Sequence, residues 1–325
     1  MSRQWIVAAA LLAVLVTGCR NSRSGGECCE VMQEHYVHQY GVEVPKKDWS
    51  ARGEYGQVIT AQKNGVIVTK NYRGGQLHGQ VTYTFPRSDA IEKTKVYQNG
   101  TLVKEVQHYP SGNPEVEILF HSPGAKTVTF WYEEGIPQRT EEFEDDILVQ
   151  GQYFNKHNQI ESRIDNGEGT RMNRDRFGNL ISTDTYTKGQ MTSRMVYHSN
   201  GSPKEIISYL NGKLHGVKKT FLPGGEPETI EHFANDQREG MSTYFVNGGK
   251  SVEIPYSKGK KHGIEKRYRN GVDVVEEISW REDKRHGSSI LVVNGQKNVE
   301  WYIDGRQVSK SHYDRYIKTP NVAVK

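Results

Sequence analysis

The sequence predicts an all-β chain, built as an elongated array of antiparallel β-hairpins in a single meandering layer. Turn residues recur every 11 or 12 positions, and β-branched and aromatic runs such as 81–85 (VTYTF) and 126–131 (KTVTFW) lie between them. No window of twelve or more residues after Ser50 has the periodicity of an amphipathic helix. Hairpins that follow one another at this spacing give a long sheet rather than a globule.

The first nineteen residues resemble the leader of a bacterial lipoprotein. After a start with one positive charge at Arg3, residues 5–16 form a twelve-residue apolar run, too short to span a membrane. The run ends in Val16-Thr17-Gly18-Cys19, which resembles a lipobox. The resemblance implies that residues 1–18 are a signal peptide, cleaved before Cys19, and that acyl chains on Cys19 anchor the protein to a membrane.

The segment after Cys19 carries signals for the membrane location of the protein and for a disulfide bond to another chain. Residues 19–26 have the polar, Gly/Ser-rich composition of a flexible tether. Residue 20 is Arg and not Asp, which by the rule for lipoproteins favours the outer membrane; the face of that membrane stays open. In an oxidising envelope the adjacent Cys28 and Cys29 are candidates for an intermolecular disulfide, and the alternative is a pair of free or buried thiols.

The body of the chain is bounded by two short segments. Residues 27–52 are expected to cap the first strand of the array, and 30–40 could form a short helix stopped by Gly41 and then Pro45. Residues 53–316 are the repeat domain. Residues 317–325 are expected to be a frayed tail.

An eight-residue motif recurs through the repeat domain, at 72–79, 209–216, 256–263 and 280–287. A fifth copy, 233–240, has Glu in place of His. From Gly216 onward the last glycine of the motif recurs with a period of 23 or 24. We expect the His–Gly pairs to form hairpin turns with a structural role, because glycine tolerates a positive φ. These pairs are His78-Gly79, His215-Gly216, His262-Gly263 and His286-Gly287.

These residues resemble the bacterial variant of the MORN repeat, as found in the YwqK family, which is usually labelled a toxin–antitoxin antitoxin. The shared core is aromatic-x-x-Gly-x-x-His-Gly, as in Tyr256 to Gly263, and the resemblance covers roughly residues 53–313. It implies an elongated, meandering antiparallel sheet. The chain departs from the family pattern at Glu265, where the common Gly-x-Gly has its second glycine, and over residues 152–183, where the rhythm fails.

Composition and cysteine usage exclude several classes of protein. The net charge of +4 comes from 43 basic and 39 acidic residues that are evenly mixed, which argues against a nucleic-acid partner. Residues 30–325 hold no cysteine, so neither a disulfide framework nor a thiolate metal site supports this part. Only 34% of residues are hydrophobic, so the core should be thin.

None of the candidate sites predicts catalysis or a metal. Residues 248–251 (GGKS) end like a phosphate-binding loop, but Tyr244 stands where the motif needs glycine. Equivalent histidines one repeat apart would be separated by about 10 Å, too far to share a metal ion. His35 and His38 have no evident third ligand, and the acidic run 141–146 is expected to be a solvated turn around Phe143. We therefore expect no enzyme, no cofactor and no metal.

Three functions remain in competition. The first is a scaffold in the cell envelope that presents a long β surface to an unidentified protein, for which Tyr, Trp and Arg are suitable contact residues. The second is a carbohydrate or peptidoglycan binder, which would need a row of exposed aromatic rings. The third is an antitoxin-like binding protein, taken from the family label, against which the export signal argues.

Overall fold

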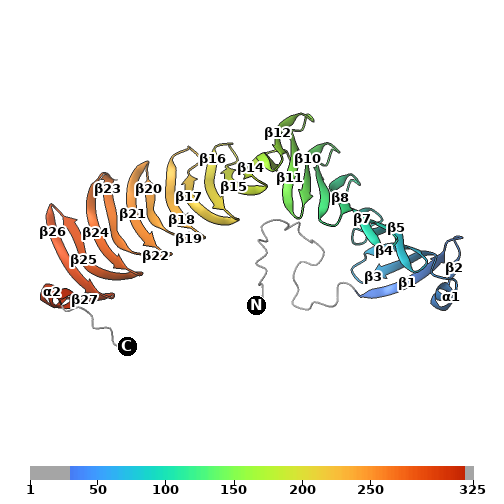
Figure 1. Cartoon of the computed structure of the whole chain (residues 1–325), viewed down its shortest axis with the longest axis horizontal. Coiled ribbons are helices and arrows are strands. Elements are labelled where there is room, and N and C mark those ends of the chain that lie inside the picture. The colour runs from blue at the N-terminus through green and yellow to red at the C-terminus, as the bar shows by residue number, and fades with distance from the viewer. Residues whose placement is uncertain (1–29, 319–325) are drawn as a thin grey trace. The chain divides into compact units, whose positions relative to one another are not determined.

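The computed structural model describes residues 30–318, and nearly all of its elements are strands. The described chain divides into two compact units. One holds the residues up to Arg171 together with 176–178, and the other holds 172–175 together with the residues from Asn179 onward. Each unit is an open antiparallel sheet of successive hairpins, as Figure 1 shows, which confirms the predicted fold class. The division falls inside residues 152–183, where the repeat rhythm fails in the sequence.

In the first unit, β1 pairs with both β2 and β3, and each later strand pairs with its neighbour in sequence. Its elements are β1 (Val31–His38), β2 (Glu43–Val44), α1 (Lys46–Ala51), β3 (Gly56–Gln62), β4 (Ile67–Arg73), β5 (Gln76–Thr84), β6 (Ile91–Gln98), β7 (Thr101–His108), β8 (Pro114–Ser122), β9 (Ala125–Trp131), β10 (Pro137–Glu144), β11 (Ile147–Phe154), β12 (Ile160–Asp165) and β13 (Glu168–Arg174), whose last residues belong to the second unit.

In the second unit, two strands are split by an irregularity, so β18 pairs with β19 and β20, and β21 pairs with β22 and β23. Its elements are β14 (Leu180–Thr187), β15 (Gln190–Tyr197), β16 (Pro203–Leu210), β17 (Lys213–Phe221), β18 (Pro227–Ala234), β19 (Gln237–Arg238), β20 (Gly240–Val246), β21 (Gly249–Ser257), β22 (Lys260–Lys261), β23 (Gly263–Gly271), β24 (Asp273–Arg281), β25 (Lys284–Val293), β26 (Gln296–Ile303), β27 (Arg306–Val308) and α2 (Lys310–Lys318).

The prediction of a helix at residues 30–40 is wrong, because Val31–His38 form strand β1. Tyr36 stands opposite Val58 of β3 and Val44 of β2, so this segment gains more from pairing with the array than a short isolated helix would offer. The helix of the cap is α1 instead. Its Trp49, 3% exposed, packs against Tyr36 and Tyr72 with ring centroids 5.8 and 6.4 Å apart.

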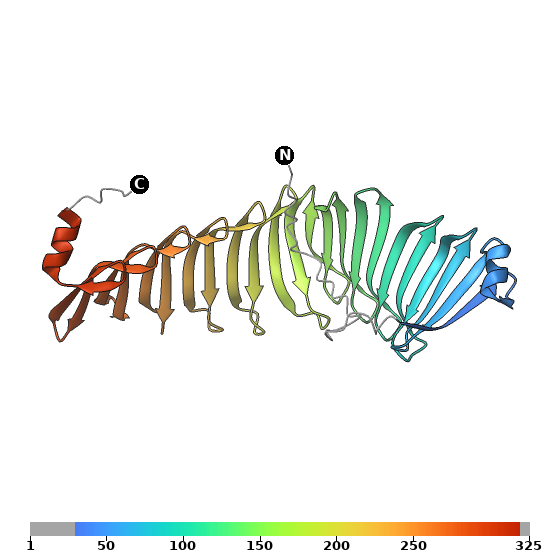
Figure 2. The same cartoon turned by 90° about the horizontal axis from the view of Figure 1, so that it is seen from below.

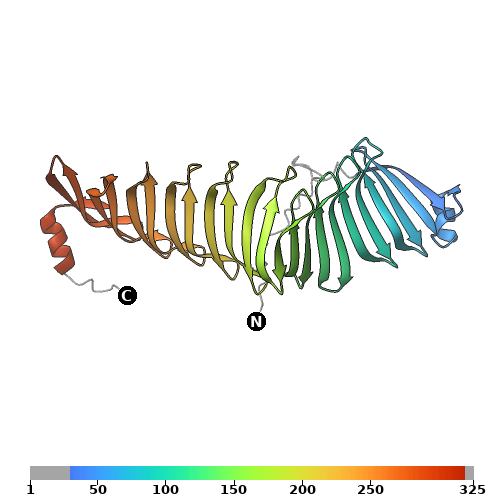
Figure 3. The ribbon, with the colours of Figure 1, turned by 90° about the horizontal axis from the view of Figure 1, so that it is seen from above.

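The other end of the described chain is closed by a helix that the sequence did not predict. Helix α2 takes up residues assigned to the last repeat and to the tail. Its Tyr313 lies on Trp301 of β26, with centroids 4.8 Å apart, and His286 contacts both Tyr313 and Tyr316. In Figure 2 and Figure 3 this helix lies beside β27, the last strand. It shields part of a sheet edge that would otherwise be open.

The core of each unit includes a row of buried side chains across the middle of one sheet face. In the first unit the row contains Val58, Val81, Val128 and Ile164, and in the second it contains Ile207, Ile254 and Ile278. Charged residues alternate with these apolar ones along each row. A single layer has no second sheet to bury this face. The core is therefore thin, as the composition predicts.

Candidate interaction surface

The His–Gly pairs do not form the hairpin turns, which corrects their predicted position. The turns are the residue pairs 74–75, 211–212, 258–259 and 282–283. His78-Gly79, His215-Gly216, His262-Gly263 and His286-Gly287 lie three and four residues beyond them. There the pairing register shifts, because the strand after the turn carries extra residues opposite its partner. The motif therefore encodes a turn followed by a bulge.

Each motif glycine lies opposite the motif aromatic of the next repeat. Gly216 pairs with Phe233, and Gly240 with Tyr256. Gly263 pairs with Trp280, and Gly287 with Tyr302. These glycines have φ between +92° and +110°, a region that other residues rarely adopt. The pairing places one aromatic side chain per repeat on the same face of the sheet.

A cation from the preceding repeat covers the ring of three of these aromatics. The residue before the His position supplies it: Arg238 lies 5.3 Å from the Tyr256 centroid, and Lys261 lies 4.5 Å from that of Trp280. Arg285 and Tyr302 repeat the arrangement at 5.3 Å. We call these three cation–aromatic pairs the stacked row. Each pair links two successive repeats through a cation–π contact.

Carboxylates on the same face hold two of these cations in place. Arg238 Nε donates to Glu231 at 2.8 Å, and Lys261 Nζ donates to Glu265 at 2.9 Å. Glu265 also accepts from Arg267 at 3.0 Å, and its side chain is 1% exposed. Burial by itself raises the pKa of Glu265, but the hydrogen bonds from Lys261 and Arg267 outweigh it and hold the pKa below its usual value. Two of the three cations of the stacked row are thus held by carboxylates.

In the first unit, Glu141 has a different role from the one predicted. The acidic run 141–146 was expected to be a solvated turn, but only Asp145 and Asp146 form the turn. Glu141 lies inside strand β10, is 1% exposed, and accepts hydrogen bonds from Tyr153 at 2.9 Å and from Arg171 at 2.7 Å. Side chains alternate between the faces of a strand, so Glu142 and Glu144 are exposed while Glu141 is buried.

Two of the motif histidines contact a turn, although not their own. Nδ1 of His78 accepts from the Asn99 amide, and Nδ1 of His286 accepts from the Asp304 amide, both at 3.3 Å. These amides belong to the next turn along the same border of the sheet. Burial and the nearby Arg281 lower the pKa of His286, so its ring is neutral at pH 7 and can accept this bond. Nδ1 of His215 is buried without a hydrogen-bond partner in the described residues.

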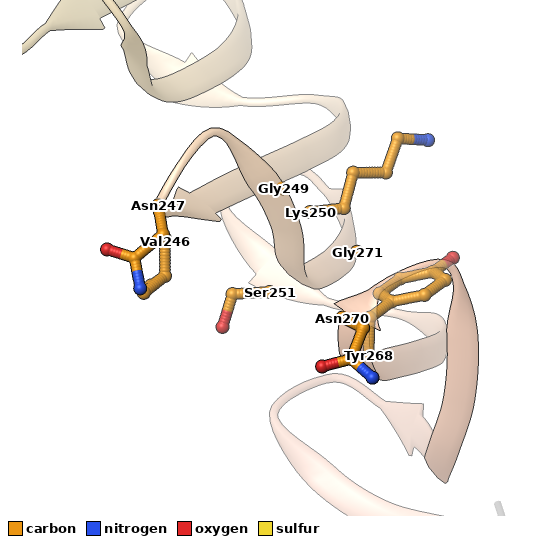
Figure 4. Close-up of a pocket in the computed structure, with 8 residues that line it drawn as sticks. All are labelled: Val246, Asn247, Gly249, Lys250, Ser251, Tyr268, Asn270 and Gly271. Atoms are coloured by element: carbon orange, nitrogen blue, oxygen red, sulfur yellow. The ribbon is translucent and has the colours of Figure 1, made fainter.

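The segment 248–251 borders an open hollow of about 350 Å³, shown in Figure 4. One side is lined by Val246, Asn247, Gly249, Lys250 and Ser251, and the other by Tyr268, Asn270 and Gly271. Lys250 belongs to strand β21 and no helix follows it, so the strand-to-helix geometry of a phosphate-binding loop does not form. Its Nζ is bound by Glu253 at 2.7 Å, and Glu253 also accepts from the Tyr268 hydroxyl.

Burial raises the pKa of Tyr268 to about 12, with a further contribution from its hydrogen bond to Glu253. Lys250, Glu253 and Tyr268 therefore form a closed set of hydrogen bonds beside the hollow.

Exposed aromatic rings form no row in residues 30–318. The most exposed ones are Tyr40, Tyr55, Phe120 and Phe177, of which only Tyr40 and Tyr55 lie in neighbouring segments. Residues 30–318 bring together no group of three or more His, Cys, Asp or Glu side chains that could hold a metal ion. No helix in this range is long and apolar enough to cross a membrane. Cys19, Cys28 and Cys29 lie outside the described part of the chain.

Neither a family model nor a curated protein matches the chain. Three solved structures are similar to it at 8–11% identity. The TcdB2-TccC3-Cdc42 structure is 11% identical with a TM-score of 0.16, and the match covers 75% of this chain and 19% of that one. BamB from Moraxella catarrhalis is 8% identical with a TM-score of 0.15, and the match covers 76% of this chain and 80% of BamB.

A porin-like protein from Bacteroides uniformis is 10% identical with a TM-score of 0.14, and the match covers 75% of this chain and 88% of that protein. This chain thus spans about a fifth of the length of the toxin-complex chain and most of the other two.

Proposed function

We propose that the protein is an exported lipoprotein, anchored by Cys19, that acts as a non-catalytic β-repeat scaffold for another protein in the cell envelope. The observation that carries the proposal is the stacked row. Arg, Tyr and Trp side chains dominate the energy of protein–protein contacts, and here they are held in fixed geometry on one sheet face. Side chains that are already ordered lose less entropy when a partner binds.

The same geometry supports a scaffold over a sugar binder. A sugar stacks on a free ring face, whereas a cation from the preceding repeat covers the rings of Tyr256, Trp280 and Tyr302. The similarity to the MORN repeat remains a resemblance and does not indicate which protein is bound. The outer membrane is the favoured location, on the strength of Arg20 after the lipidation site.

Site-specific photo-crosslinking in cells tests the proposal. A crosslinkable amino acid at Arg267 would face the side of the stacked row, and one at Ile264 in the same strand would face the opposite side. Both side chains are about half exposed, so reactivity is matched. We expect one protein to be captured at Arg267, identified by mass spectrometry, and lost with Trp280→Ala. Capture of the same protein from both positions, or only from Ile264, would count against this face.

A further inference from the structure

The hairpin turns on one border of the second unit form a continuous line. We call this border the short-turn edge; it holds the turns 188–189, 211–212, 235–236, 258–259, 282–283 and 304–305. Neighbouring turns are joined through the backbone: the Asp236 amide donates to the Leu214 carbonyl at 2.9 Å. The Asp283 amide donates to Lys261 at 3.1 Å, and equivalent bonds join the turns of Gly259 and Gly305 to their predecessors.

This line is strongly basic. Within two residues of its turns stand ten basic and four acidic residues, a net charge of +6. The opposite edge of the same unit, counted in the same way around loops 198–202, 222–226, 247–248, 270–272 and 294–295, has four basic and three acidic residues. The corresponding turns of the first unit, 74–75, 99–100, 123–124, 145–146 and 166–167, have two basic and five acidic residues. Of these three edges, only the short-turn edge carries a strong positive charge.

Half of the ten cations on the short-turn edge are engaged with other side chains. Arg238, Lys260, Lys261 and Arg281 form ion pairs, and Arg285 covers Tyr302. The other five are exposed, and their side chains form no ion pair within residues 30–318. They are Lys188, Lys213, Lys258, Lys284 and Arg306. Each stands in a turn or directly after one.

We propose that the short-turn edge binds a linear acidic polysaccharide, whose carboxylates pair with these exposed cations. Equivalent positions two strands apart lie about 10 Å from each other, so the line from Lys213 to Arg306 extends about 40 Å in single file. Cations in single file match a chain of negative charges better than a plane of them. Single-stranded nucleic acid would also need exposed rings on which bases stack, and the aromatic residues within two positions of these turns are all buried or half-buried. This binding is independent of the protein partner proposed above.

Two triple variants with the same change in net charge test the proposal. K213Q/K258Q/K284Q removes three exposed lysines from the short-turn edge, and K204Q/R269Q/K297Q removes three exposed cations from the opposite edge. Alginate oligosaccharides of graded length are the probe, and dextran is the neutral control. For the full chain we expect affinity to rise with alginate length up to about 40 Å. The affinity for alginate should fall at least tenfold in K213Q/K258Q/K284Q and less than twofold in K204Q/R269Q/K297Q.

The salt dependence gives a second readout. Removal of three charge contacts should lower the slope of log affinity against log salt by about two in the first triple only. Equal losses in both triples, or affinity that does not depend on alginate length, would overturn the proposal. So would tighter binding to oligothymidylate, or binding to anionic phospholipid vesicles but not to alginate through the same lysines.

Discussion

At the scale of single residues, the last glycine of the repeat motif is required by its positive φ and by a neighbouring strand that leaves little room for a Cβ. Gly263 has a φ of +110°, and a Cβ at this position would approach Cγ of Pro255 to 3.0 Å. We expect Gly263→Ala to destabilise the protein by about 2–3 kcal/mol in urea unfolding, because backbone strain and crowding add. Gly248→Ala is the control. Its φ of +75° is also unfavourable, but no heavy atom lies within 4 Å of its Cβ position, so its cost should be about 1 kcal/mol.

A buried carboxylate makes stability depend on pH. The pKa of Glu265 is lower in the folded state than its usual value, so its contribution is present at neutral pH and is lost as the pH falls through the folded-state pKa. Glu265→Gln should cost about 1–3 kcal/mol at pH 7, because Lys261 and Arg267 lose their partner but remain partly hydrated. The difference from wild type should shrink towards pH 3. A difference in unfolding free energy between wild type and Glu265→Gln that stays constant from pH 7 to pH 3 would contradict this role.

At the scale of elements, the terminal helix protects the strands it covers. Tyr313 and Tyr316 connect α2 to Trp301, His286 and Arg281. We expect Y313A/Y316A to detach α2 at a cost of about 2–3 kcal/mol. Amide hydrogen exchange should then speed up at least tenfold in α2, β26 and β27, and stay unchanged in β15–β18. Ile317→Ala is the control on the same helix, because this side chain is 57% exposed and should matter little.

For the whole molecule, the proposed lipidation of Cys19 predicts where the protein resides. The Val16–Cys19 motif leads us to expect that a labelled fatty acid is incorporated into wild type and not into Cys19→Ala. The variant should remain uncut or appear in the soluble fraction, because Cys19 is the one attachment point of the proposed anchor. Label that persists in the Ala variant would place the acyl chain elsewhere.

The adjacent thiols next to the tether predict a covalent dimer or a link to another protein. Non-reducing gels after rapid thiol blocking should show a band of higher mass. The band should disappear in C28S/C29S and persist in Cys19→Ala. A monomer band alone in wild type would refute the intermolecular disulfide.

The sequence by itself determined the local features of this protein. Turn residues such as Asn211-Gly212 and Lys258-Gly259 mark hairpins because few residues tolerate a positive φ. The spacing between them determined strand length, and the eight-residue motif identified the repeat. These signals are local, since turn chemistry and strand alternation act over a few neighbouring residues.

Only the tertiary structure decided how the repeats contact one another. Gly263 faces Trp280 and Arg285 covers Tyr302 because successive strands pair in a bulged register, which depends on partners some twenty residues apart. Strand pairing also made residues 31–38 a strand and not a helix, and strand alternation buried Glu141 beside Arg171. Such outcomes depend on which segments meet in space, and no short window of sequence contains that information.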